Sequence, residues 1–210
     1  MDLNNKELII IGDIDNASMI IFWFHGYGSN NWSFEPTMKM INMYLNDDAC
    51  IIMPNAPAVE GKRSWYPLPS TDKSGTIIED FKGLEDSKKS VSKFINNFKI
   101  KDNQKIIVGG FSQGAALSLS MLFNTNLSFA GCVALSGYMP SADHYKDLDI
   151  VNAKILIAHG YSDQAISFED YKKTYKFLTG KTNNIQSYTG DFGHTITKDV
   201  YDKIIEWLGD

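Results

Sequence analysis

A serine stands between two glycines where a predicted strand meets a predicted helix. The segment Gly110-Phe111-Ser112-Gln113-Gly114 joins the end of the apolar run KIIVGGF (105–111) to the start of the helical pattern GAALSLSMLFN (114–124). A sharp strand–turn–helix connection exposes the central side chain, and small flanking residues relieve crowding there. Such a turn presents a hydroxyl for attack on a carbonyl carbon, so we predict Ser112 as a nucleophile. Its purely structural role would be that of a helix N-cap.

A serine hydroxyl needs a neighbouring base to take its proton. Of the histidines after Ser112, His144 lies in the polar stretch PSADHYKDL and fits a solvated loop. His159 ends a predicted strand, but it precedes the best acid candidate. His194, in GDFGHTI, lies between the last predicted strand and the last predicted helix. The order nucleophile, acid, histidine accompanies this type of turn. His194 is therefore the predicted base, and its structural alternative is a loop histidine that caps the final helix.

The acid that orients the imidazole should come from a loop between the serine and the histidine. Asp163 follows the predicted strand KILIAHG (154–160), which comes just before the strand that leads to His194. Asp191 is only three residues from His194, a spacing typical of a local turn hydrogen bond. We therefore predict Asp163. The other aspartates considered are Asp143, Asp147 and Asp149, which form a surface charge run, and Asp170.

Acyl transfer also needs hydrogen-bond donors that face the developing oxyanion. The backbone N–H of the residue after the nucleophile, Gln113, usually supplies one donor. The loop FHGYGSN, which follows an early strand, is the predicted source of the other, with Tyr27 as the donor. Its glycines allow a close approach of the backbone to a substrate. His25 precedes Ser112 and is expected to hold this loop by hydrogen bonds.

The elements that position these residues alternate between strand and helix. The middle strands are continuous apolar runs, which is typical of strands covered on both faces. We predict an α/β fold with a mostly parallel central sheet, helices on both faces and one domain over 1–210. The first two strands are close enough in sequence to be neighbours. Predicted strands cover 7–12, 18–26, 50–57, 105–111, 129–138, 154–160 and 185–190, and predicted helices cover 36–46, 75–98, 114–124, 167–179 and 195–208.

Composition narrows the class of protein. The net charge of −5 and the single arginine, Arg63, argue against nucleic acid as a partner. Cys50 and Cys132 lie in apolar stretches without metal-ligand spacing, so reduced core cysteines are expected. We expect no metal and no organic cofactor.

The N-terminal MDLNNKELIII has no signal-peptide pattern, and no run reaches about 18 apolar residues. We therefore expect no transmembrane segment and a cytoplasmic location.

Seven motifs, in order along nearly the whole chain, resemble the small carboxylesterase, acyl-protein thioesterase and lysophospholipase family of the α/β-hydrolase fold. They are FHGYGSN, PNAP, RSWYPL, GFSQGAALS, ALSGYMP, AHGYSD and GDFGHTI. The resemblance implies a Ser112–Asp163–His194 triad with Tyr27 and Gln113 as oxyanion donors. It also implies that Trp65 borders the acyl site; the structural alternative for Trp65 is a loop anchor on the sheet edge.

The chain departs from the family pattern at three places. Tyr27 stands where the family usually has an aliphatic residue, Pro67 stands where it often has aspartate, and Asp163-Gln164-Ala165-Ile166-Ser167 lacks the two prolines often found there. These changes leave the triad residues in place and affect the predicted pocket. The predicted apolar walls of that pocket are Trp65, Tyr66, Phe111, Met139 and Ile166.

We therefore expect a serine hydrolase that cleaves carboxylic esters or thioesters, of the short or medium acyl, lysophospholipid or acyl-protein type. At 210 residues, there is no room for a large lid domain. The alternatives are a related hydrolase, such as a dienelactone hydrolase or small peptidase, and a non-catalytic binding module. The elbow serine argues against the dienelactone type, which would carry cysteine. An exposed aromatic patch (Trp32, Phe34, Trp65, Tyr66) would mark transient membrane-surface, partner or dimer contact, so monomer and homodimer both stay open.

Overall fold

The computed structural model describes residues 7–74, 77–123, 126–149 and 152–210. Its main sheet has seven strands in the order β1-β3-β2-β8-β9-β10-β11. Their bounds are β1 Ile9–Ile11, β2 Met19–Phe24, β3 Ala49–Met53, β8 Lys105–Phe111, β9 Gly131–Leu135, β10 Lys154–Gly160 and β11 Ile185–Gly190. β1 pairs antiparallel with β3, and the other neighbouring pairs are parallel. The predicted mostly parallel sheet is confirmed.

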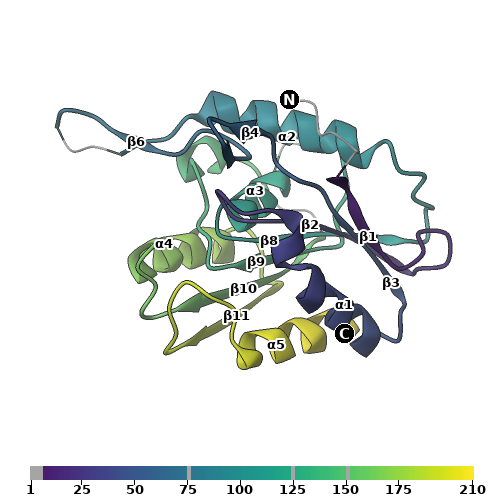
Figure 1. The fold of residues 1–210 in the computed structure, drawn as a ribbon. Helices are drawn as coiled ribbons and strands as arrows, with labels where there is room; N and C mark the ends of the chain where they lie inside the picture. Colours follow the sequence, from purple (N-terminus) through teal and green to yellow (C-terminus); the bar gives the residue numbers. More distant parts are fainter. Residues whose placement is uncertain (1–6, 75–76, 124–125, 150–151) are drawn as a thin grey trace.

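Helices cover both faces of this sheet, as predicted (Figure 1). On one face lie α2 (Phe81–Ile95), α3 (Gln113–Met121) and α4 (Phe168–Thr179). On the other lie α1 (Glu35–Tyr44) and α5 (Lys198–Gly209). In the described part of the chain, no separate lid domain covers the sheet.

The strand β2 shows why its sequence is apolar without interruption. All six of its residues are buried, and alternate side chains enter two different core clusters. Ile20, Phe22 and Phe24 pack towards α2, α3 and α4, whereas Met19, Ile21 and Trp23 pack towards α1 and α5. Burial of each such side chain contributes roughly 1.5–3 kcal/mol. A strand with one solvent-exposed face would have alternated between apolar and polar residues.

Two sequence expectations about the elements are wrong. The strands predicted at 7–12 and 18–26 are not neighbours, because β3 lies between β1 and β2. The helix predicted over 75–98 begins only at Phe81, where the Asp80 side chain accepts a hydrogen bond from the Gly83 N–H and caps it. Residues 75–76 lie outside the described residues.

Before that cap, the chain forms a hairpin that projects from the body (Figure 1). Its strands are β6 (Ser70–Thr71) and β7 (Ile77–Ile78). We call this segment (67–74 and 77–79) the arm. A second short hairpin, β4 (Ala58–Val59) with β5 (Lys62–Arg63), precedes it.

No helix in the described ranges combines the length and apolarity needed to cross a membrane.

Candidate active site

The turn between β8 and α3 holds Ser112 in a strained backbone conformation. Its φ of 57° and ψ of −118° lie where non-glycine residues are rare. Such strain costs on the order of 1–3 kcal/mol and persists only where the surroundings enforce it. The backbone N–H of Ser112 donates to the Leu135 carbonyl at 2.9 Å, which ties the turn to β9.

Glycine is required beside this turn because β2 passes so close. A β-carbon on Gly114 would lie 2.0 Å from the Phe24 carbonyl oxygen, and one on Gly110 would lie 2.4 Å from the same atom. The crowding that the sequence predicted at these positions is therefore present.

Asp163 and His194 form a hydrogen-bonded pair. Oδ2 of the buried Asp163 accepts from Nδ1 of His194 at 2.7 Å. Oδ1 accepts from the backbone N–H groups of Ala165 and Ile166, at 2.8 and 2.9 Å. The carboxylate is thus fixed by its own loop, and its contact with Nδ1 leaves Nε2 of His194 as the basic nitrogen of a neutral ring.

Asp163 and His194 lie at the same edge of the sheet as Ser112. The ring of His194 packs against that of Phe111, the residue before Ser112, with centroids 4.6 Å apart. On the other side, a β-carbon on Gly26 would lie 3.3 Å from Cβ of Ser112. The loop with His194 and the FHGYGSN loop therefore flank the predicted nucleophile.

A second histidine, which sequence reasoning passed over, supports the acid loop. His159 is fully buried, and its Nε2 lies 3.0 Å from the Ile166 carbonyl oxygen and 3.5 Å from Oδ2 of Asp163. The carbonyl partner requires a proton on Nε2. Nδ1 has no hydrogen-bond partner among the described residues, which is tolerable for a neutral ring and costly for a charged one. His159 thus holds the loop 163–166 in place through the Ile166 carbonyl.

The remaining predicted alternatives lie elsewhere. Asp191 accepts a hydrogen bond from the Ser162 hydroxyl at 3.2 Å. His144 is exposed and stacks on Phe81 with ring centroids 3.8 Å apart. His144 is solvated as expected, whereas Asp191 binds a residue 29 positions away in the chain and does not make the expected local turn hydrogen bond.

The loop that carries Tyr27 is held by His25. Nδ1 of His25 donates to the Gly26 carbonyl at 2.7 Å, and Nε2 accepts from the Ala56 N–H at 3.1 Å. Burial lowers the pKa of His25 from 6.5 to about 4, and the nearby charge of Arg63 acts in the same direction. The ring is therefore neutral near neutral pH, and it holds the loop by hydrogen bonds as the sequence suggested.

Gln113 joins this loop to the next one through its side chain. Oε1 accepts from the backbone N–H of Trp65 at 3.0 Å, and Nε2 donates to the Tyr66 carbonyl at 2.7 Å. The indole N–H of Trp65 donates in turn to the His25 carbonyl at 2.7 Å. The sequence marked Gln113 only for its backbone, because an amide side chain gives no sign of whether it is buried.

The fully buried Trp65 changes two expectations. Its ring anchors the loop from within, so we drop it from the predicted substrate wall. The predicted exposed aromatic patch is also wrong: Phe34, Trp65 and Tyr66 are buried, whereas Trp32 is 69% exposed. These three rings fill the core beneath the loops, where aromatic side chains bury the most area.

The other predicted wall residues have mixed exposure. Tyr66 and Met139 are 6% exposed, and Phe111 and Ile166 are partly exposed. Their contact with a substrate stays a prediction, as does the role of Tyr27, whose side chain is 39% exposed.

A groove of about 650 Å³ lies beside the end of the Tyr27 loop, at Asn30. Its lining residues are Glu7, Leu8, Ile9, Asn30, Trp32, Glu35, Asn55 and Arg63. None of Ser112, Asp163 and His194 lines it. The groove is therefore not the predicted active site, which lies on the loops that carry Ser112, Asp163 and His194.

A parallel sheet with helices on both faces and a serine at a strand–turn–helix elbow defines the α/β-hydrolase fold. Residues 4–209 match the Phospholipase/Carboxylesterase family, so the chain belongs to this family of hydrolytic enzymes. It is 30% identical to acyl-protein thioesterase 1 of Candida albicans over 214 residues, with 92% of each chain covered. It is 28% identical to carboxylesterase SOBER1 of Arabidopsis thaliana, covering 91% of this chain and 90% of the relative.

A solved structure supports the fold independently. Acyl-protein thioesterase 2 of Zea mays superposes with a TM-score of 0.82 at 20% identity, covering 96% of this chain and 97% of the other. The predicted family, fold and enzyme class are confirmed.

Proposed function

We propose that this protein hydrolyses carboxylic esters or thioesters through an acyl-enzyme on Ser112. The observation that carries the proposal is the strained elbow of Ser112 beside the hydrogen-bonded Asp163–His194 pair. The family match supports hydrolysis of an ester or thioester bond.

The reaction proceeds in two displacement steps. Nε2 of His194 takes the Ser112 hydroxyl proton as Oγ attacks the carbonyl carbon, and Asp163 stabilises the resulting imidazolium. The backbone N–H groups of Tyr27 and Gln113 stabilise the oxyanion. His194 then protonates the leaving alkoxide or thiolate. Water, deprotonated by His194, attacks the acyl-enzyme and releases the carboxylic acid and Ser112.

The names of two relatives, acyl-protein thioesterase 1 and carboxylesterase SOBER1, suggest two leaving groups, a protein thiol and an alcohol. We propose short or medium acyl chains as the substrate class. The proposed apolar wall consists of the buried Tyr66 and Met139 and the partly exposed Phe111 and Ile166. Matched S-acyl and O-acyl peptides would separate thioesterase from esterase activity.

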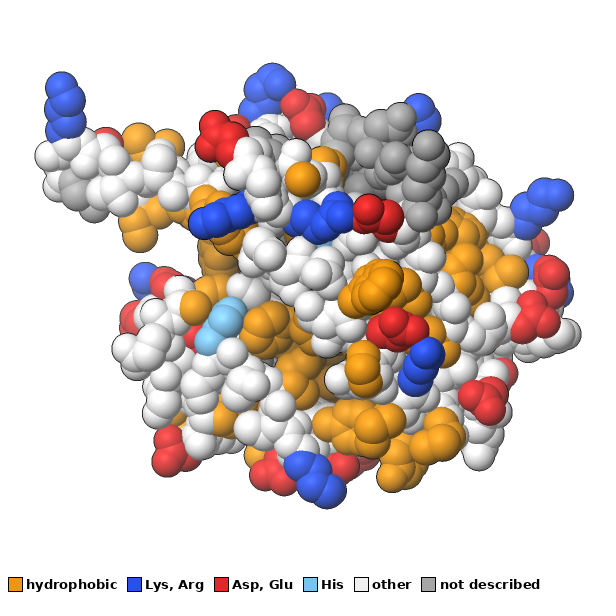
Figure 2. Space-filling view, in the orientation of Figure 1, with side chains coloured by type: hydrophobic (Ala, Val, Ile, Leu, Met, Phe, Trp, Pro, Cys, Tyr) orange, Lys and Arg blue, Asp and Glu red, His pale blue; other side chains and the backbone are white. Residues whose placement is uncertain are grey.

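A lipid surface is the second proposed partner. Leu68, Ile77 and Ile78 on the arm are 47%, 70% and 50% exposed. Figure 2 shows hydrophobic side chains at the surface of this projecting segment. Exposed aliphatic side chains on a projecting hairpin favour contact with an apolar surface. Sedimentation with phosphatidylcholine vesicles should recover the wild type, and less of a variant with serine at these three positions. We also retain the cytoplasmic location as a proposal, supported by the two buried free thiols.

Fluorophosphonate labelling followed by intact mass tests the mechanism. We expect one adduct on the wild type, none on Ser112→Ala and slow labelling of His194→Ala. Nitrophenyl esters of increasing chain length then size the pocket. A folded wild type that neither labels nor turns over any ester would favour the binding module instead, and cleavage of peptides alone would favour the peptidase.

A further inference from the structure

The loop 25–31 must hold the Tyr27 N–H in place, yet its own sequence does not stiffen it. It has two glycines, and Gly28 has a φ of +69°. An oxyanion donor is effective only when its position is fixed before the reaction. The contacts that fix this loop must therefore come from other segments.

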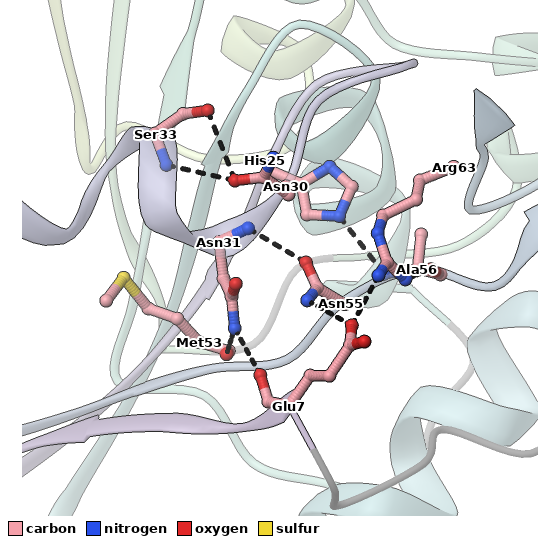
Figure 3. Close-up of polar contacts among 9 residues, drawn as sticks. All are labelled: Glu7, His25, Asn30, Asn31, Ser33, Met53, Asn55, Ala56 and Arg63. Atoms are coloured by element: carbon pink, nitrogen blue, oxygen red, sulfur yellow. Dashed lines mark hydrogen bonds and ion pairs between the residues drawn. The ribbon is translucent and has the colours of Figure 1, made fainter.

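Arg63 supports the loop with both its backbone and its side chain. Its carbonyl accepts from the Gly28 N–H at 2.8 Å. Its Nη1 donates to the Ala56 carbonyl at 2.9 Å, and the N–H of the same Ala56 donates to His25. Figure 3 shows the guanidinium turned towards Ala56 and Glu7. One residue thus reaches the loop at Gly28 directly and at His25 through Ala56.

The end of the loop is held by the same group of residues. Oδ1 of Asn55 accepts from the Asn31 N–H at 2.8 Å, and Nδ2 of Asn55 donates to the Glu7 carboxylate at 3.0 Å. Nη2 of Arg63 pairs with that same carboxylate oxygen (Figure 3). The loop is therefore fixed at positions 25, 28 and 31 by one connected network.

The hydrogen bond from Arg63 to the Ala56 carbonyl contributes more to holding the loop than the ion pair between Arg63 and Glu7 does. The Glu7 side chain is 57% exposed, and water screens exposed ion pairs, so this pair contributes little to holding the loop. Ala56 is fully buried, so loss of its carbonyl's partner is costly. The planar guanidinium reaches a carbonyl and a carboxylate at once, whereas a lysine ammonium is a point charge.

We propose that Arg63 is a positioning residue for the oxyanion loop and acts through its fork geometry. This inference rests on the proposed function, because that function assigns the Tyr27 N–H to the oxyanion. Labelling and turnover of the wild type are therefore established first. Their failure would overturn the proposed function, whereas the variants below decide the role of Arg63.

The test compares Arg63→Lys, Arg63→Gln and Glu7→Gln with the control Lys39→Gln. Lys39 forms an exposed ion pair with Glu35 at 2.7 Å on α1, close to the same groove. We expect both Arg63 variants to lower kcat roughly 10- to 100-fold, with KM within about twofold. Affinity for a trifluoromethyl ketone, which forms a tetrahedral oxyanion adduct, should fall by the same factor. Glu7→Gln should stay within about threefold, and Lys39→Gln should match the wild type.

Three results would overturn the proposal. Wild-type kcat in Arg63→Lys would show that charge alone suffices. Lower kcat with unchanged ketone affinity would show a loss unrelated to the oxyanion. Equal, salt-sensitive losses in Glu7→Gln and Arg63→Gln would assign the effect to the ion pair. If Arg63→Gln does not fold, Arg63→Lys decides, because it keeps the positive charge on a side chain only one bond shorter and removes the fork.

Discussion

The side-chain Oε1 of Gln113 accepts a hydrogen bond of 3.0 Å from the backbone N–H of Trp65. This bond joins the first residue of α3 to a loop 48 positions earlier in the chain. Since Trp65 also binds the His25 carbonyl, the segments that carry the two proposed oxyanion donors are mechanically linked.

Gln113→Leu should therefore lower both stability and activity. It leaves the buried Trp65 N–H without its acceptor, at roughly 1–3 kcal/mol. It also removes one of the two donors to the Tyr66 carbonyl, which keeps the Ser64 hydroxyl at 2.6 Å. We expect kcat per folded enzyme to fall, as measured by ester turnover normalised to active-site titration. Gln104→Leu is the matched control, because this buried amide binds Ile14 and Ala17 far from Ser112. An equal loss of kcat in both variants would contradict the prediction.

Acid should destabilise the fold through His25. Its pKa is 6.5 in the unfolded chain and about 4 in the folded one, so the unfolded state binds the proton first. The stability contributed by the neutral ring is complete above pH 6.5 and is lost as pH falls towards 4. The free energy of unfolding should fall by an amount on the order of 3 kcal/mol. Urea unfolding across this range should show a shallower pH dependence for His25→Gln than for the wild type; parallel curves would exclude the assignment.

His159 should control the order of the acid loop. His159→Leu removes the donor to Ile166, whereas Gln keeps an N–H at similar reach. We expect the low-field NMR resonance of the His194 Nδ1 proton to broaden or vanish in the leucine variant and to persist in His159→Gln. His144→Gln, on the surface, is the control. An unchanged resonance in His159→Leu would show that the Asp163–His194 pair needs no such support.

Gly114→Ala should be strongly destabilising. The added β-carbon would meet the Phe24 carbonyl at 2.0 Å, so β2 or α3 must move, at about 1–3 kcal/mol or more. Thermal unfolding would report the loss, and fluorophosphonate labelling should slow because the elbow shifts. Gly209→Ala, whose β-carbon would meet nothing within 4 Å, is expected to be neutral. Equal melting temperatures for the two variants would refute the crowding argument.

The sequence alone determined the main strands of the sheet and the order of the predicted catalytic residues along the chain. Continuous apolar runs such as 105–111 and 154–160 are long enough to identify buried strands, and these two match β8 and β10 without error. The placement of Asp163 and His194 after consecutive strands, β10 and β11, follows from the parallel topology. Parallel strands end at one edge, so residues that follow them meet there.

The tertiary structure alone decided the sheet order and the arm. The proximity of 7–12 to 18–26 in sequence says nothing about β3, whose long-range pairing separates them. Ile77 and Ile78 fit a helical pattern, yet they pair with Ser70 and Thr71, because short apolar segments satisfy either period.

Burial of polar groups was likewise visible only in three dimensions. The sequence does not show what the side chains of His159, Gln113 and Arg63 bind, because their hydrogen-bond partners lie between 7 and 56 positions away. A side chain's hydrogen-bond partners are set by how separate segments pack, and packing has no local sequence period. Residue type and order therefore predicted the chemistry, and the fold decided what holds the predicted residues in place.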